Sequence, residues 1–292
     1  MVLRWALRAC AGLAGVIAAL ILVFLVLESI PALRAIGVVR LVTDSTWRPD
    51  ADAAAGAGAF GLLPMVYGTI AATVGAVLVA APLGVLSAVF SRFYAPRGVA
   101  VAYRRVVELL AGVPSVVYGL WGLVVLVPLI RRIEPSVPGP SLLAGIAILA
   151  LMIFPTIALL ADAALGAVPA ASIRGAAALG LTRWATVRSV ALPVARGGIG
   201  TGVLLGTGRA LGETMAVLMV CGNVVQTPSS LFDPIRTLTA NIALEMGYAA
   251  GDHRAALFAS GLVLMLLVVA LVVLAEWASR GDIRWSGEGV DA

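Results

Sequence analysis

The chain has 292 residues, of which 61% are hydrophobic and only 12% are charged, and its formal net charge is +5. This composition excludes an ordinary soluble domain, because apolar runs of about 20 residues are long enough to cross the hydrocarbon core of a membrane. Every basic side chain other than the single histidine is arginine, so the chain lacks the lysine of a phosphate-binding loop. Any ATP hydrolysis that drives this protein therefore requires another subunit.

Six apolar blocks predict an all-α polytopic membrane protein with six transmembrane helices. The first block is expected to stay as a helix, since its apolar core is longer than that of a usual signal peptide and no small-residue cleavage site follows. In chain order, the expected spans are residues 11–30, 63–90, 113–130, 142–161, 197–221 and 255–277. They form a permease domain over residues 11–277, between an N-terminal segment, 1–10, and a tail, 278–292.

Arginines are more frequent in the segments on the N-terminal side of the membrane than on the opposite side, which places both termini in the cytoplasm. We interpret the positive charge as topology and expect no nucleic-acid binding, because the arginines lie between apolar blocks without an aromatic-rich basic patch. The outer segment 34–62 is expected to be irregular, and 223–254 to contain one short helix near 238–246. His253 is expected to be solvated in a loop, and no disulfide is expected.

The inner loop, residues 162–196, predicts two short helices that meet at a corner. Gly180 can end the first helix in the left-handed conformation common just past helix ends. Thr182 can cap a second helix over Arg183–Val190, and Pro193 is expected to close it. The corner presents Leu181 and Trp184 to solvent, which indicates a socket for a partner protein.

Two charges, Arg209 and Glu213, lie inside the fifth predicted span, where one arginine costs about 2.5–3.5 kcal/mol at a helix centre. Their spacing of four residues places them on one helix face, where they can form an ion pair. A structural pair and a substrate contact are both open: the guanidinium fork matches phosphate, and Glu213 can accept the phosphate proton. Nearby, glycines repeat every fourth residue and predict close helix packing at Gly198, Gly202, Gly206, Gly208 and Gly212.

Residues Ser115 and Tyr118 in the third predicted span follow Pro114 and share a helix face. A proline removes a backbone donor, so the carbonyl groups that it frees must be satisfied nearby. Two interpretations stay open. Either Ser115 bonds its own helix and Tyr118 packs, or both hydroxyl groups line a polar path.

The spacing from Ala176 through Gly180 to Val190-Ala191-Leu192-Pro193 resembles the EAA loop of ABC importer permeases. Arg174 and Gly175 depart from that pattern, because the family usually has Glu and Ala there. The stretches AGVPSVVYGLWGL, LPMVYGT and GRALGETMAV resemble PstC-type phosphate permeases. The resemblance implies a type I ABC importer permease in the bacterial inner membrane that carries inorganic phosphate.

The same resemblance implies functional residues and partners. The substrate path would contain Arg209, Glu213, Thr214, Ser115 and Tyr118. The corner that couples to the ATPase would contain Ala176, Gly180, Leu181, Thr182, Arg183 and Trp184. The partners would be a PstA-type permease, a PstB-type ATPase dimer and a PstS-type phosphate-binding protein that docks on the outer loops. This chain would be no enzyme and would bind no cofactor, since ATP and Mg belong to the ATPase.

Three alternatives differ in class. An ABC importer of the same kind could carry another oxyanion, such as molybdate or sulfate. An ion-coupled secondary transporter would work without an ATPase, but it usually has an inverted repeat that the sequence does not display. An intramembrane hydrolase lacks support, because neither a GxSxG nor an HExxH motif occurs.

Overall fold

The computed structural model describes residues 2–49 and 59–283, and it is almost entirely helical. In chain order the elements are α1 (Val2–Ala35), α2 (Val38–Thr43), β1 (Trp47–Arg48), β2 (Ala59–Phe60), α3 (Leu63–Val89), the π-helix η1 (Phe90–Tyr94), α4 (Arg97–Ala111), α5 (Ser115–Trp121), the π-helix η2 (Gly122–Leu126), α6 (Val127–Ile133), α7 (Leu142–Gly166), α8 (Ala170–Ala178), α9 (Arg183–Thr186), the π-helix η3 (Val187–Ala191), α10 (Leu192–Leu211), α11 (Met215–Val220), α12 (Leu238–Glu245) and α13 (Gly251–Ile283).

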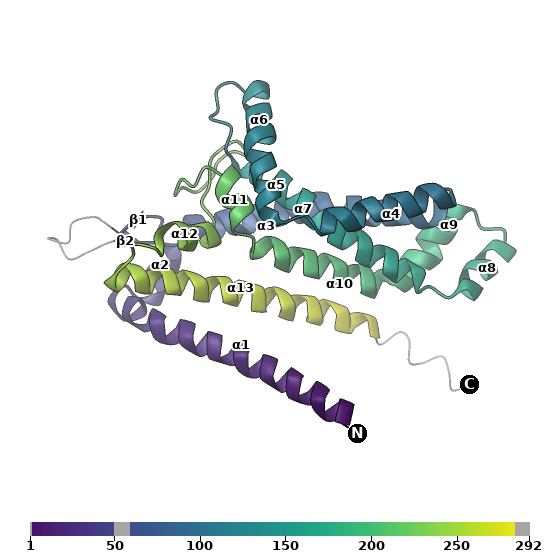
Figure 1. Cartoon of the computed structure of the whole chain (residues 1–292), viewed down its shortest axis with the longest axis horizontal. Helices are drawn as coiled ribbons and strands as arrows, with labels where there is room; N and C mark the ends of the chain where they lie inside the picture. The colour runs from purple at the N-terminus through teal and green to yellow at the C-terminus, as the bar shows by residue number, and fades with distance from the viewer. Residues whose placement is uncertain (1, 50–58, 284–292) are drawn as a thin grey trace.

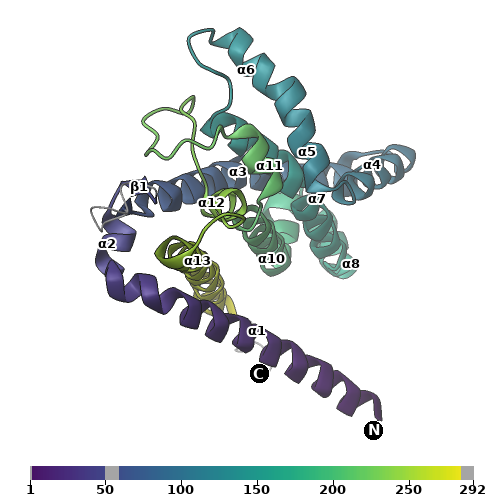
Figure 2. The same cartoon turned by 60° about the vertical axis from the view of Figure 1, so that its left-hand side comes forward.

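Six helical segments of the described chain are long and apolar enough to cross a membrane, as the sequence predicted. Figure 1 shows α1, α3, α7, α10 and α13 along the long axis of the molecule, whereas α5 and α6 turn away from it. The N-terminus of α1 and the end of α13 point toward the end of the molecule that carries α8 and α9. In Figure 2, α1 and α13 lie on one side of the bundle and α4 on the other.

Helix α7 is the centre of the bundle, and α3 and α10 pack along it. Its side chains are apolar over most of the length, and Ile148, Ile153 and Ile157 are completely buried. The glycine repeat of α10 faces this helix. A Cβ atom at Gly198 would lie 2.6 Å from the Cβ of Ala164, and one at Gly206 would lie 3.0 Å from Ile157.

The predicted close packing at these glycines is therefore confirmed, because only a residue without a side chain permits this approach. The close packing predicted at Gly208 and Gly212 is wrong, because a Cβ atom at Gly208 would meet nothing within 4 Å and one at Gly212 would meet only the Gly208 carbonyl oxygen, at 3.6 Å.

The fifth span differs from its prediction at both ends. It was expected over residues 197–221, but the continuous helical segment runs from Arg183 to Leu211. Pro193 does not end a helix, which corrects the prediction. The π-helix η3, whose turn is wider than that of an α-helix, lies just before Pro193. The wider turn prevents a clash between the proline ring and the backbone carbonyl one turn earlier. The same arrangement precedes Pro128, where η2 leads into α6.

The outer segments are more ordered than the sequence suggested. Residues 34–62 were expected to be irregular, but they contain α2 and the antiparallel pair β1–β2, in which Trp47 lies opposite Phe60. The short helix predicted near residues 238–246 is confirmed as α12. His253 is not a solvated loop residue, because its side chain is only 11% exposed and lies in α13 beside Glu245. Both cysteines are free, as expected.

Gly202→Ala should destabilise the bundle, because its new Cβ atom would lie 2.9 Å from the Cβ of Leu160 on α7. Overpacking of this kind costs about 1–3 kcal/mol. The matched control is Gly200→Ala in the same helix, where nothing lies within 4 Å and the better helix former should add about 0.5–1 kcal/mol. Thermal unfolding of the purified chain measures both. Equal melting temperatures for the two variants would contradict the packing.

Candidate functional site

The charged stretch of the fifth span lies where that span breaks. Helix α10 ends at Leu211, Gly212 follows as its C-cap residue, and α11 begins at Met215. The Arg209 side chain is exposed in the last turn of α10, while Glu213 is partly buried between the two helices. One Glu213 carboxylate oxygen accepts a hydrogen bond of 3.1 Å from the Ala216 backbone N–H.

The predicted ion pair between Arg209 and Glu213 does not form in the described structure. The i, i+4 rule requires a continuous helix, and the break at Gly212 removes that geometry. Each charge instead lies at the helix end that favours it. Arg209 is near the partly negative C-terminus of α10, and Glu213 is near the partly positive N-terminus of α11.

The two hydroxyl residues of the third span lie close to this break. Helix α5 packs against α11, and a Cβ atom at Gly119 would lie 2.9 Å from the Cα of Ala216. The Tyr118 hydroxyl donates a hydrogen bond of 2.8 Å to the Leu110 carbonyl, so a carbonyl freed by Pro114 is satisfied locally.

The structure therefore gives Tyr118 a packing role. Ser115 is the first residue of α5 and is partly buried.

Thr214 lies within the break itself. Its hydroxyl donates a hydrogen bond of 3.3 Å to the Gly212 carbonyl. The Glu213 carbonyl accepts a hydrogen bond of 2.8 Å from Thr239, which ties the break to α12. The structure thus gathers Arg209, Glu213 and Thr214 at the break between α10 and α11, and α5, which carries Tyr118, packs against α11.

The inner corner forms as predicted. Gly180 has a left-handed φ of +77°. The backbone N–H of Gly180 bonds the Ala177 carbonyl at 3.0 Å, and that of Leu181 bonds the Ala176 carbonyl at 3.1 Å. This pair of bonds is the Schellman motif that closes helices on a glycine. Thr182 caps the next helix by accepting a bond of 3.3 Å from Ala185.

The corner presents apolar side chains to the outside. Leu179 is 83% exposed, Trp184 52% and Leu181 38%, and Arg183 beside them is also exposed. Sequence reasoning missed Leu179, the most exposed of the three, although it directly precedes Gly180. Ala176 is instead buried, so it is not part of the exposed corner.

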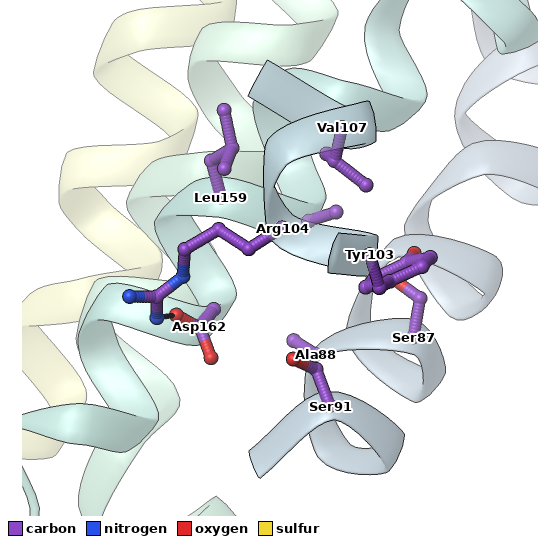
Figure 3. A pocket seen from close by; sticks show the side chains of 9 residues that line it. Ser87, Ala88, Ser91, Tyr103, Arg104, Val107, Leu159 and Asp162 are labelled. Carbon is purple, nitrogen blue, oxygen red and sulfur yellow. Dashed lines mark hydrogen bonds and ion pairs between the residues drawn. The ribbon is translucent and has the colours of Figure 1, made fainter. Parts of the chain in front are cut away.

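A charge cluster around Asp162 was not predicted. Asp162 lies near the end of α7 and receives the guanidinium groups of Arg92 and Arg104 on one oxygen, Oδ2. Figure 3 shows Arg104 reaching across from α4 to this carboxylate, with Tyr103 on the same helix facing Ser87. The partners are 58 and 70 residues from Asp162 in the sequence. The only sequence signal was an acidic residue at the end of an apolar block.

A second cluster, around Glu245, was also not predicted. Its carboxylate accepts hydrogen bonds from Trp47 at 2.9 Å and Arg236 at 2.5 Å, and it contacts His253 Nε2 at 2.8 Å. These contacts hold the β1–β2 hairpin, α12 and the start of α13 together. Earlier in the chain, between α11 and α12, Asp233 accepts backbone hydrogen bonds from Ser229 and Ser230, which hold the pKa of this carboxyl below its usual range.

The structure is thus a bundle of six candidate membrane-spanning helices, with a charged break in one span and an apolar corner between two spans. The chain belongs to the family described as the binding-protein-dependent transport system inner membrane component, whose sequence model matches residues 80–281. It is therefore a multi-pass permease subunit rather than an enzyme, as the sequence indicated.

Curated relatives cover most of the chain. YqgH of Bacillus subtilis, described as a probable ABC transporter permease protein, is 38% identical over 94% of this chain and 89% of its own length. The phosphate transport system permease protein PstC of Mesorhizobium japonicum is 36% identical over 81% of this chain and 76% of its own. PstC 1 of Mycobacterium tuberculosis is 34% identical over 96% of this chain and 92% of its own length.

Solved structures share the fold. A permease chain from the inward-facing MetNI methionine ABC transporter matches with a TM-score of 0.57 and 21% identity, over 76% of this chain and 94% of that chain. A chain of a bacterial ABC transporter involved in the import of alginate matches with a TM-score of 0.56 and 16% identity. The match covers 77% of this chain and 79% of that chain. The predicted type I importer fold is thereby confirmed.

Proposed function

We propose that this chain is the PstC-type permease subunit of an ABC importer for inorganic phosphate. Its family membership makes it a permease of a binding-protein-dependent importer, and several curated relatives at 32–38% identity are named as phosphate permeases. The observation that carries the proposal is the exposed Arg209 in the last turn of α10, at the break of the fifth span that also holds Glu213.

Arg209 is suited to contact the transported anion. No carboxylate in the described part of the chain pairs with it, so its planar fork of donors is available to bind phosphate oxygens. An ionisable group at membrane depth is costly and usually faces a bundle interior or a substrate path. A partner PstA-type permease would close that path over the exposed side of α10 and α5.

Glu213 is suited to tell phosphate from sulfate. Phosphate at neutral pH still carries a P–OH proton, whereas sulfate carries none. A carboxylate beside Arg209 would accept that proton in a hydrogen bond and would repel a fully ionised anion. Sites that depend on one required hydrogen bond discriminate strongly.

The corner at Gly180 is suited to couple transport to ATP hydrolysis in a PstB-type ATPase dimer. The exposed side chains Leu179, Leu181 and Trp184 form an apolar knob that can insert into a cleft of a partner. This assignment places the corner and both termini in the cytoplasm. The opposite end, with residues 34–62 and 223–254, would then face a PstS-type binding protein, and ATP and Mg would be bound by the ATPase.

Arg209→Gln should reduce phosphate uptake at least tenfold in cells that depend on this importer, because an amide lacks both the charge and the fork. Arg209→Lys keeps the charge but not the paired donors, so its phosphate uptake should lie between that of Arg209→Gln and that of the parent protein. Radiolabelled phosphate uptake measures both, with membrane abundance as the control. Full uptake by Arg209→Gln would remove this residue from the substrate path.

Glu213→Gln should alter selectivity more than folding, because its amide oxygen can still accept the hydrogen bond from Ala216. We expect phosphate uptake to fall and its inhibition by sulfate to rise. Competition of labelled phosphate with sulfate and molybdate measures the change. In the same assay the parent protein must prefer phosphate. If molybdate or sulfate competed more strongly than unlabelled phosphate, the importer would carry another oxyanion.

Leu181→Ala/Trp184→Ala should abolish co-purification of the ATPase, because the substitutions remove two exposed parts of the corner. The matched control is Val194→Ala, which removes an exposed apolar side chain from α10 away from the corner. A pull-down from membranes, followed by ATPase assay, measures both. Transport that persists without any ATPase would favour a secondary transporter and would overturn the proposed coupling.

A further inference from the structure

We propose that a basic cavity at the α8 end of the bundle binds the phosphate group of an anionic phospholipid with a hydroxylated headgroup, as in phosphatidylglycerol. The cavity has a volume of about 440 Å³ and lies between η1, α4 and α7. Four arginines and one carboxylate line it: Arg92, Arg97, Arg104, Arg105 and Asp162. This site is separate from the break at Arg209 and does not depend on which substrate is carried.

The charges around the cavity are not balanced. Arg92 and Arg104 both point at Asp162 and share its Oδ2 atom. No ion pair involves Arg97 or Arg105 in the described part of the chain. Both lie on α4 and are exposed, so two guanidinium groups are available to an anion that enters the cavity. Arginine binds phosphate oxygens with paired donors.

The carboxylate explains why the headgroup should also carry a hydroxyl. The Asp162 side chain is only 11% exposed, and its Oδ1 atom is buried without a hydrogen-bond partner. A buried acceptor of this kind costs free energy until a donor reaches it. The glycerol hydroxyls of a phosphatidylglycerol headgroup are such donors, whereas inorganic sulfate has none.

The surroundings of the cavity favour a lipid over a free anion. Helix α4 carries exposed apolar side chains beside its arginines, including Val99, Val106 and Leu109. Such a helix can lie at the membrane interface, with apolar side chains against acyl chains and arginines at the headgroups. Helix α4, which lines the cavity, lies toward the end of the bundle that carries α8 and α9 (Figure 1). In the proposed orientation this is the cytoplasmic leaflet, where basic pockets between helices bind anionic headgroups.

The test uses Arg97→Gln/Arg105→Gln in the full-length chain, purified in nanodiscs of phosphatidylcholine with a graded fraction of phosphatidylglycerol. Native mass spectrometry counts the phosphatidylglycerol molecules retained. The affinity should fall about 10- to 30-fold, since each arginine near a membrane surface contributes about a factor of five. The matched control is Arg131→Gln/Arg132→Gln, which removes two exposed arginines from α6 outside this cavity. The control should retain lipid like the parent.

Equal retention by Arg97→Gln/Arg105→Gln and its control would overturn the proposal. So would binding of radiolabelled inorganic phosphate, in discs of phosphatidylcholine alone, that the same variant abolishes, because the site would then belong to a free anion. Arg97→Lys/Arg105→Lys should keep most of the lipid, which separates loss of charge from misfolding. None of these measurements involves transport, so their failure would leave the proposed function untouched.

Discussion

The approach of α3 and α10 to the central helix α7 is the constraint on which the rest of the bundle depends. Ile157 of α7 is completely buried between Gly84 of α3 and Gly206 of α10, and a Cβ atom at either glycine would lie within about 3 Å of it. Lipid tails are as apolar as these side chains, so van der Waals contact rather than the hydrophobic effect must hold the helices together. Small residues at these positions make that contact close.

The fifth span breaks just beyond this packing. Helix α10 packs along α7 and ends at Leu211, and the following helix α11 packs against α5. The break leaves unsatisfied backbone groups, which Glu213 and Thr214 partly satisfy. Two charges that looked costly in a continuous helix thereby become tolerable, because each lies at a helix end of opposite polarity.

Much of this structure follows from local sequence patterns. Apolar length predicts the spans, and Gly180 with Thr182 predicts the corner, because capping is decided within a few residues. The predicted ion pair between Arg209 and Glu213 is wrong, because the prediction assumed a continuous helix and the helix is interrupted at Gly212. The clusters at Asp162 and Glu245 join residues far apart in the chain, and spacing along a sequence carries no information about such contacts.

The corrected course of the fifth span joins the corner to the charged break. The sequence suggested a short helix closed at Pro193, but the helix is continuous from Arg183 to Leu211 over 29 residues, which is about 43 Å at 1.5 Å per residue. A displacement of the corner by an ATPase would therefore move the Arg209 end with it. Ala164 and Ile157 of α7 lie in the gaps that Gly198 and Gly206 leave on α10, so α7 would have to follow that movement.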